Sequence, residues 1–345
     1  MKYQKPLKLN KGDTVAVLSP SWSGPNAFPH IYENGLKVLK EWGLVVKEYP
    51  TTRASNKFLT ENPKARAEDI NSAFKDRSVK AIIASIGGED SIRILPFLDK
   101  NIIKKNPKIF MGFSDTTTIL TFLNTQGLVT FYGPSIMAGF SQMENLPKEF
   151  KLHVHDMLFE PKKTFEYLPY AKYCEGYLNW SKKENVGKVN KLKSNKGWNV
   201  IQGNGIVKGQ LFGGCIEVLE FMKGTEFWPS DNFWKNKILF FETSEEKPTV
   251  MQIKRTLRNY GVQGIFNKVS AILFARPRDY SDKEKADLEK VIKEVVAIEF
   301  SKPHLPIMSN LDFGHTDPQF ILPMGASTKI DFSHKKIELI ESWLR

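Results

Sequence analysis

Short apolar runs alternate with amphipathic segments along the first 135 residues. The apolar runs have the length of strands and are bounded by glycine, proline or charged residues; they lie at 13–19, 44–49, 79–85, 108–111 and 129–132. Between them, apolar residues recur at helical spacing at 28–42, 63–74, 91–98 and 116–126. Strands that alternate with helices predict a parallel sheet with right-handed crossovers, whose ligand sites lie beyond the carboxyl ends of the strands.

The pattern loses its periodicity after residue 165 and resumes at Gly205. Residues 166–204 combine tryptophans, lysines and glycines without a regular period, so we expect a linker with a long loop. Beyond it, the sequence predicts strands at 205–211, 237–243, 269–274 and 306–309, helices at 216–222, 250–260 and 281–300, and short strands from 320 to 340. We therefore expect an α/β protein with one domain at 1–165 and a second at 205–345.

The composition limits the class of protein. Hydrophobic residues make up 41% of the 345 residues, an ordinary share for a globular protein. The longest apolar runs, such as 237–241, are far shorter than a membrane span, and the N-terminus lacks the apolar stretch of a signal peptide. With only Cys174 and Cys215, we expect neither a disulfide framework nor a cysteine zinc site. A cytoplasmic location without membrane contact fits these features.

The net charge of +12 suggests an anionic partner. The lysines are scattered among acidic residues, and the densest basic segment, 182–196, fits a solvated loop, a surface for a small anionic molecule or a weak nucleic-acid patch. No zinc-finger, RNP or helix-turn-helix pattern accompanies it. We therefore expect no nucleic-acid polymer as a partner.

A sharp turn at Gly112-Phe113-Ser114-Asp115 joins a buried strand to a helix. The bend holds the Ser114 hydroxyl clear of the strand and close to the positive end of the helix. This is the geometry of a nucleophile elbow, although GFSD differs from the usual G-x-S-x-G pattern. The alternative is that Ser114 is simply the N-cap of the helix.

A serine nucleophile needs a base, usually histidine, which an acid orients. His315 is the best candidate because it follows Gly314 in a loop just past the strand predicted at 306–309, with Asp312 and Asp317 nearby. The alternative is a surface or capping histidine. The other histidines lie in less suitable segments; they are His30, His153, His155, His304 and His334.

The acid that would orient His315 has several candidates. Glu242 directly follows the buried run at 238–241, and a carboxylate at the mouth of a buried strand needs a partner. Its alternative role is a salt bridge or a cap on the following helix. Asp312 and Asp317 compete by their closeness to His315 in the sequence, and spacing alone does not choose among the three.

Two backbone N–H groups are candidates for an oxyanion hole. One belongs to Asp115, next to the serine, and the other to Gly88, in the turn after the third strand. Glycine lets the backbone approach a substrate closely. The competing interpretation makes Gly87-Gly88 a phosphate-binding turn, but neither a G-x-G-x-x-G nor a Walker pattern surrounds it.

Five short segments, taken together and in order, match a known family. They are SIGGEDSIRILPFLD at 85–99, GFSDTT at 112–117, LFGGCIEVLEFM at 211–222, FFETSEE at 240–246 and SNLDFGHTDPQFILPMG at 309–325. From about Leu9 to Leu339 the chain resembles the LD-carboxypeptidase family of serine peptidases. This family also contains the microcin C self-immunity proteins, and within the family the chain resembles this branch more.

The resemblance implies a Ser–His–Glu triad and selects Glu242 over Asp312 as the acid. The implied site residues are Ser114 as nucleophile, His315 as base, Glu242 as acid, and the N–H groups of Gly88 and Asp115 as oxyanion donors. It also implies an N-terminal parallel-sheet α/β domain that carries the serine and a mixed α/β C-terminal domain that carries the other two residues. The active site would lie at their interface, usually in a homodimer, without metal or cofactor.

Two substrates are compatible with the resemblance. One branch of the family trims murein tetrapeptides, and the other cleaves peptidyl or aminoacyl nucleotides. The segment 167–198 looks like the second branch, in which an aromatic residue stacks on the nucleobase, and Trp180 is our candidate; stacking contributes about 1–3 kcal/mol per base. Alternatively, Trp180 only packs the loop. The competing function is a non-catalytic two-domain protein that binds a small anionic ligand.

Overall fold

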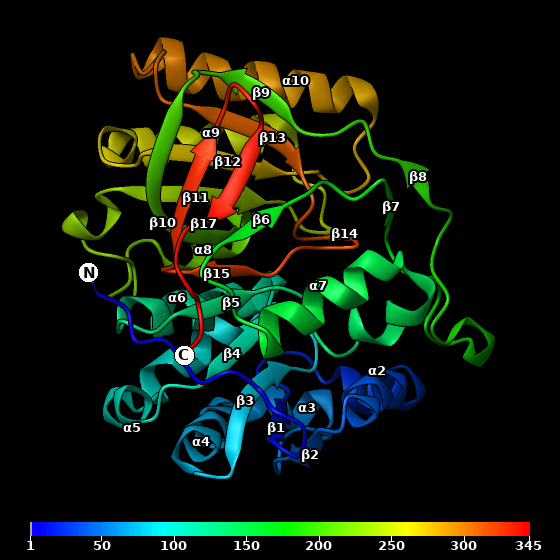
Figure 1. Ribbon diagram of the computed structural model, residues 1–345. Helices are drawn as coiled ribbons and strands as arrows, with labels where there is room; N and C mark the ends of the chain where they lie inside the picture. The colour runs from blue at the N-terminus through cyan, green and yellow to red at the C-terminus, as the bar shows by residue number, and fades with distance from the viewer. Residues whose placement is uncertain (1) are drawn as a thin grey trace.

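The computed structural model describes residues 2–345, whose strands form two large sheets and one small sheet. The N-terminal half, blue to cyan in Figure 1, lies below the C-terminal half, yellow to red, and each half is built on one of the large sheets. The chain is thus an α/β protein with two sheet domains, as the sequence predicted. None of the helices in the described part is long and apolar enough to cross a bilayer.

The N-terminal half contains a six-stranded sheet in the order β15-β5-β4-β3-β1-β2. Strands β1 to β5 are parallel, and only β15, which comes from the end of the chain, runs antiparallel. The strands are β1 Thr14–Leu18, β2 Val45–Glu48, β3 Val79–Ala84, β4 Ile109–Gly112, β5 Thr130–Tyr132 and β15 Leu322–Met324. The helices are α1 Gly24–Ala27, α2 Pro29–Glu41, α3 Asn56–Glu61, α4 Pro63–Lys75, α5 Lys100–Lys105, α6 Thr117–Thr125 and α7 Lys148–Phe159, with 3-10 turns η1 Ser91–Phe97, η2 Ser114–Thr116 and η3 Phe140–Asn145.

Every residue of β4 is buried, as expected for a central parallel strand with helices on both faces. Fully burying side chains such as Ile109, Phe110 and Met111 contributes about 1.5–3 kcal/mol each, which anchors the strand that leads to Ser114. The predicted strands and the helices at 28–42, 63–74 and 116–126 are confirmed. The segment 91–98 instead forms 3-10 turns, since Pro96 lies within it and cannot donate a helical hydrogen bond.

The C-terminal half contains an eight-stranded mixed sheet in the order β6-β17-β16-β10-β11-β12-β13-β9. Its four central strands, β10 to β13, are parallel, and the flanking strands are antiparallel. The strands are β6 Phe165–Tyr167, β9 Asn199–Gln202, β10 Ile206–Cys215, β11 Lys237–Glu242, β12 Ala271–Ala275, β13 Ile307–Leu311, β16 Ser327–Asp331 and β17 Lys336–Leu339. The helices are α8 Ile216–Met222, α9 Val250–Val262 and α10 Asp282–Lys293, with turns η4 Lys183–Asn185, η5 Asp231–Trp234 and η6 Ile265–Asn267.

Two helices of this half differ from their predicted bounds. Helix α9 continues through Gly261, and the glycine that ends it in the left-handed conformation is Gly264, with φ +71°. The helix predicted at 281–300 ends its α-helical part at Lys293 and continues as a π-helical segment, η7 Glu294–Glu299. Figure 1 shows α10 along the outer edge of the C-terminal half, away from the N-terminal sheet.

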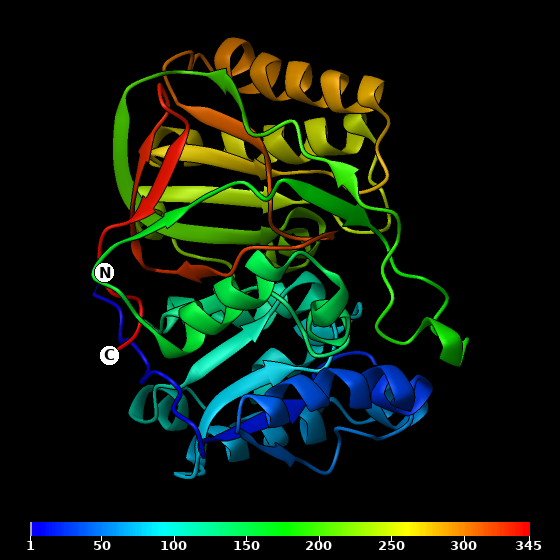
Figure 2. The same ribbon diagram turned by 45° about the vertical axis from the view of Figure 1, so that its right-hand side comes forward.

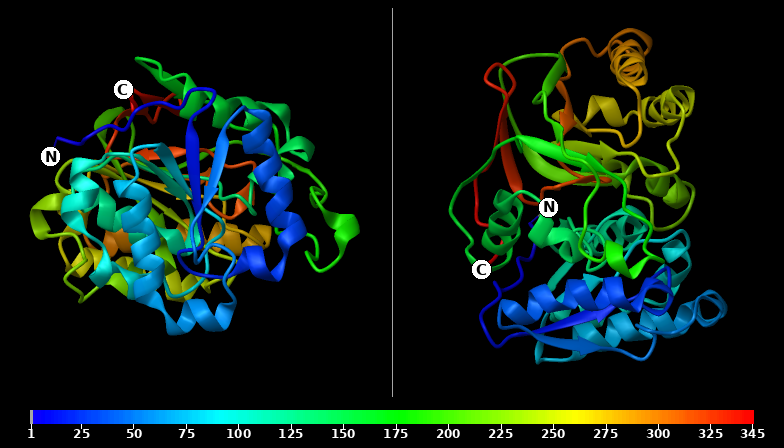
Figure 3. Two further views of the ribbon diagram at one scale, coloured as in Figure 1. Left: turned by 90° about the horizontal axis from the view of Figure 1, so that it is seen from below. Right: turned by 90° about the vertical axis from the view of Figure 1, so that its right-hand side faces the viewer.

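The segment expected to be a linker with a long loop has more structure than predicted. Strands β6 and β9 join the eight-stranded sheet, and a small sheet is formed by β7 Lys172–Glu175, β8 Lys193–Ser194 and β14 Thr316–Asp317. The part between β7 and β8 reaches down to the N-terminal half (Figures 2 and 3), where His30 Nε2 donates to the Trp180 carbonyl over 2.6 Å. The boundaries at 165 and 204 stay predictions, because the segment belongs to both halves.

Candidate active site

Ser114 begins the turn η2 between β4 and α6, with φ +58°. A residue other than glycine in the left-handed region is uncommon and is typical of turns held under strain at functional sites. The N-cap residues of η2 and α6 are Phe113 and Thr116, and neither helix has a side-chain cap bond. The N-cap interpretation of Ser114 is therefore wrong, and its hydroxyl is left for another use.

The backbone around Ser114 is fixed from three directions. The Ser114 N–H donates to the Tyr132 hydroxyl over 3.3 Å, and the Thr117 hydroxyl donates to the Ser114 carbonyl over 2.6 Å. Gly87 packs directly on the serine, because a Cβ at Gly87 would lie 2.8 Å from Ser114 Cβ and 2.9 Å from Oγ. The turn that contains Gly87-Gly88 therefore needs glycine beside the nucleophile candidate.

Asp115 has a buried side chain and a backbone N–H next to the serine. Its carboxylate accepts the Ser91 N–H over 2.8 Å, and its carbonyl accepts the Ser91 hydroxyl over 2.7 Å. Burial raises the pKa of this carboxyl group, and the hydrogen bonds that the carboxylate accepts oppose this change. The added Cβ at Gly87 would lie 3.4 Å from the Asp115 nitrogen, so the Gly87-Gly88 turn runs past this N–H. The use of the Gly88 and Asp115 N–H groups as oxyanion donors stays a prediction.

Glu242 and His315 come from the ends of two parallel strands, β11 and β13, and meet in the interior. His315 Nδ1 donates to Glu242 Oε2 over 2.6 Å, and both side chains are buried. Gly314 allows this contact, because a Cβ there would lie 2.5 Å from Glu242 Oε2. The interpretation of His315 as a surface histidine is wrong.

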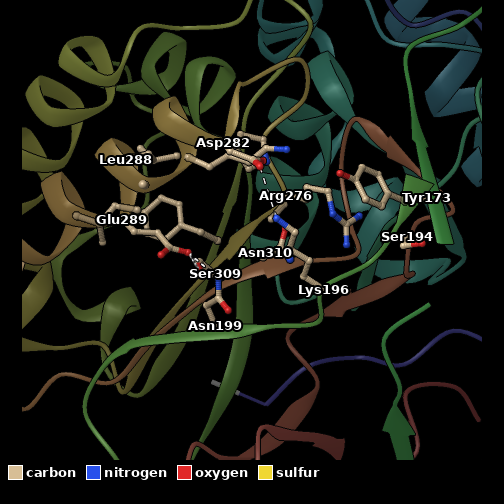
Figure 4. Close-up of a pocket in the computed structure, with 16 residues that line it drawn as sticks. Tyr173, Ser194, Lys196, Asn199, Arg276, Asp282, Leu288, Glu289, Ser309 and Asn310 are labelled. Atoms are coloured by element: carbon tan, nitrogen blue, oxygen red, sulfur yellow. Dashed lines mark hydrogen bonds and ion pairs between the residues drawn. The ribbon is translucent and has the colours of Figure 1, made fainter. Parts of the chain in front are cut away.

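The two competing acids have other partners. Asp312 is buried and accepts hydrogen bonds from Arg276 over 2.6 Å and from Trp198 Nε1 over 3.0 Å, and Asp317 accepts one from Gln319 over 3.4 Å. Arg276 lies beside Tyr173 in a cavity of 250 Å³ (Figure 4), with its guanidinium 3.9 Å from the tyrosine ring. For the described residues 2–345, no hydrogen bond joins His315 to Asp312 or Asp317.

Tyr132 is a site residue that the sequence analysis missed. It ends β5, is buried, and donates its hydroxyl proton to Glu242 Oε1 while it accepts the Ser114 N–H. Burial and the neighbouring Glu242 raise the pKa of the phenol, so it keeps this proton. The hydroxyl thus connects Glu242 of the C-terminal half with the Ser114 turn of the N-terminal half. The only signal in the sequence was its place at the end of a predicted strand.

Glu245 is the second residue that was missed. Its Oε2 lies 2.9 Å from His315 Nε2, and its side chain is 56% exposed. Burial alone would lower the pKa of His315, but the charges and hydrogen bonds of Glu242 and Glu245 outweigh burial and raise this pKa to about 10. The hydrogen bond from His315 in turn lowers the pKa of Glu245 to about 2.

A cavity of 750 Å³ opens over these residues. Its wall includes Gly88, Ser114, Glu245 and His315 from the site just described and Trp180 from the segment between β7 and β8. The cavity therefore brings together residues of both domains and of the connecting segment. Among residues 2–345, no group of three or more His, Cys, Asp or Glu side chains could hold a metal ion.

One end of the cavity is lined by aromatic side chains, and the cavity wall as a whole carries both positive and negative charges. Trp180 packs edge-on against Phe28, with ring centroids 5.8 Å apart, and against Tyr177 at 5.3 Å. Trp180 thus packs the loop and also faces the cavity, and its stacking on a nucleobase stays a prediction. The cavity wall carries arginines such as Arg278 and also carboxylates such as Glu89, so the overall basic charge of the chain does not extend into it as a uniform surface.

Both large parts of the chain match models of one family. Residues 15–133 match the LD-carboxypeptidase N-terminal domain, and residues 208–330 match the LD-carboxypeptidase C-terminal domain. The first region contains Ser114, and the second contains Glu242 and His315.

Individual relatives cover almost the whole chain. The Microcin C7 self-immunity protein MccF of Escherichia coli is 27% identical, with 96% of this chain and 94% of the relative covered. The probable murein peptide carboxypeptidase of Bacillus subtilis (strain 168) is 29% identical, with 96% and 92% covered. A solved structure of MccF in complex with aspartyl sulfamoyl adenosine superposes with a TM-score of 0.86 at 26% identity, and covers 99% of this chain and 100% of that one.

Proposed function

The chain belongs to the LD-carboxypeptidase family, and on that premise we propose that it is a serine carboxypeptidase that hydrolyses a C-terminal amide bond. The proposed triad is Ser114, His315 and Glu242. The observation that carries the proposal is the buried hydrogen bond from His315 Nδ1 to Glu242, at the cavity that Ser114 also faces. A buried acid that holds Nδ1 of a histidine orients the ring so that Nε2 can serve as the base for a serine.

In the proposed mechanism, neutral His315 accepts the proton of Ser114 at Nε2 as Oγ attacks the scissile carbonyl. The N–H groups of Gly88 and Asp115 stabilise the oxyanion of the tetrahedral intermediate. Glu242 keeps the ring in the tautomer with the proton on Nδ1 and stabilises the imidazolium. The proton then passes from Nε2 to the leaving group, and water hydrolyses the acyl-enzyme with His315 as base.

Two substrate classes remain in the proposal: a murein tetrapeptide, and a peptidyl or aminoacyl nucleotide. The nucleotide is supported by Trp180, which faces the cavity from the segment expected to contact a nucleobase. It is also supported by the similarity to MccF, whose structure was solved with an aminoacyl nucleotide analogue. The murein peptide is supported by the similarity to the Bacillus relative. A homodimer, which the resemblance implied, and a cytoplasmic location, which the composition favoured, are further parts of this proposal.

A paired hydrolysis assay tests the proposal. The purified protein and its Ser114→Ala variant are each given a murein tetrapeptide and an aspartyl-adenylate amide, and the products are followed by mass. We expect wild-type protein to cleave one substrate and the variant to lose nearly all of this activity while it keeps the wild-type circular dichroism spectrum. Cleavage that survives in the variant contradicts the mechanism. Binding of either compound without cleavage favours the non-catalytic binding protein.

A further inference from the structure

Both nitrogens of His315 contact a carboxylate. Nδ1 lies 2.6 Å from Glu242 and Nε2 lies 2.9 Å from Glu245. An ionised carboxylate only accepts hydrogen bonds, so each ring nitrogen must carry a proton to make these two bonds. The ring is then an imidazolium without a lone pair. In this arrangement His315 cannot accept the proton of Ser114.

We propose that Glu245 is an inhibitory carboxylate that holds His315 in its protonated form and must leave Nε2 before Ser114 can react. This inference rests on the proposed function, because it concerns the base of the proposed triad. When Glu245 moves away, the Nε2 proton passes to solvent. The neutral ring then presents its Nε2 lone pair to the serine hydroxyl.

The environment of Glu245 allows this movement, whereas that of Glu242 does not. The Glu245 side chain is more than half exposed, in the connection between β11 and α9. The start of this connection is fixed, because Ser244 donates from its N–H and its hydroxyl to Glu217, over 2.9 and 2.8 Å. A rotation of the Glu245 side chain therefore suffices, with the backbone in place.

A second basic partner for Glu245 lies in the same cavity. Arg278 lines the cavity wall, and its charge contributes to the low pKa of Glu245. Arg278 forms an ion pair with Asp279 over 3.1 Å. Asp279 is 51% exposed and Arg278 is 17% exposed, so water can solvate the Asp279 carboxylate when Arg278 turns to another carboxylate. Glu245 can therefore move from His315 towards Arg278 without losing a charged partner.

The charged groups that face His315 decide the direction of the expected pKa change. They are Glu242 and Glu245 in direct contact and Asp317 nearby, whose own pKa burial raises. Each carboxylate favours the protonated ring. Removing the charge of Glu245 must therefore lower the pKa of His315, while Glu242 still fixes Nδ1. The neutral, reactive ring then becomes available at lower pH.

The experiment compares wild-type protein with Glu245→Gln and, as a matched control, Glu246→Gln, which removes the exposed carboxylate next in the chain. The pKa of His315 is measured by NMR of the labelled imidazole, and the rate of Ser114 modification by a fluorophosphonate is measured from pH 5 to pH 10. We expect Glu245→Gln to lower the pKa of His315 by at least one unit and to speed the modification at pH 7 by about tenfold, because one unit is a tenfold change in the neutral fraction. We expect the control to match wild-type protein.

Each other outcome counts against the inference in a recognisable way. An unchanged pKa of His315 in Glu245→Gln would show that the contact does not control the ring. Equal modification rates in wild-type protein and Glu245→Gln would remove the inhibitory role and leave the serine mechanism intact. Absence of Ser114 modification in every variant, at a pH where NMR shows a neutral His315, would instead overturn the proposed function and the inhibitory role with it.

Discussion

The two edges of the His315 ring face different environments, although each contacts a carboxylate. At the Nδ1 edge, Glu242 is 1% exposed and also accepts the hydroxyl of Tyr132; at the Nε2 edge, Glu245 is 56% exposed. Breaking the contact of buried Glu242 leaves a buried charge without a partner, which is costly, whereas the exposed carboxylate of Glu245 can turn from His315 into solvent. The difference indicates that the buried edge fixes the ring and the open edge can change during the reaction.

The largest effect on activity is expected from a substitution at the buried edge, where Glu242 contacts Nδ1. In Glu242→Gln, the amide can no longer stabilise the imidazolium and can hold the ring in the wrong tautomer. We expect kcat to fall by about 10⁴-fold, as for the corresponding change in other triads. The measurement is steady-state hydrolysis of the substrate that the paired assay identifies. Activity within tenfold of wild-type protein would show that Glu242 does not orient the base.

A milder change at the same edge is Tyr132→Phe, which removes one hydrogen bond to Glu242. Hydrogen bonds to charged groups contribute about 1.5–3 kcal/mol, so we expect kcat/KM to fall by roughly ten- to a hundredfold. The negative charge of Glu242 is then shared with fewer donors, so it favours the protonated ring more strongly and raises the pKa of His315.

The sign of the pH effect distinguishes this role of Tyr132 from a purely structural one. Since His315 must be neutral to act as a base, a higher pKa moves the acidic limb of kcat/KM to higher pH in Tyr132→Phe. Glu245→Gln, at the open edge, must move this limb to lower pH. If kcat/KM of Tyr132→Phe falls by the same factor at every pH and its acidic limb stays at the wild-type pH, Tyr132 merely supports the fold.

The smallest expected effect belongs to Trp180→Ala, in the cavity beyond the open edge. Stacking contributes about 1–3 kcal/mol per base, so with a nucleotide substrate we expect KM to rise about tenfold. We expect kcat and the pKa of His315 to stay unchanged, because the structure places Trp180 against Phe28 and Tyr177 and not against the triad. A loss confined to kcat would contradict a role in substrate binding. A murein tetrapeptide should be affected less.

Much of this site could be predicted from the sequence, because strands in a parallel sheet bring their carboxyl ends together. Ser114 and Gly88 follow β4 and β3, and Glu242 and His315 follow β11 and β13, so their positions after apolar runs were informative. Asp312 is paired with Arg276, which directly follows β12, and this pairing distinguishes Asp312 from Glu242 as a partner for His315. Spacing in the sequence does not reveal that this arginine is buried against Asp312.

The missed residues lacked such a signal. Tyr132 belongs to an apolar run, and its partner Glu242 lies 110 positions away, so its hydroxyl looked like part of a buried strand end. Glu245 lies in a polar stretch between a strand and a helix, which is typical of a solvated loop. Its contact with His315 depends on how the loop is folded back by Ser244, which no local pattern encodes.

The central claim is that Glu242 stays fixed at Nδ1 of His315 while Glu245 leaves Nε2 during the reaction. The most direct test is a crystal structure of the protein after reaction with a fluorophosphonate. The account predicts a covalent bond from Ser114 Oγ to phosphorus, with Glu245 moved away from Nε2 and this nitrogen within hydrogen-bond distance of the adduct. At the buried edge, the contacts of Glu242 with His315 and Tyr132 should be unchanged. An adduct on Ser114 with Glu245 still bonded to Nε2, or a displaced Glu242, would contradict the account.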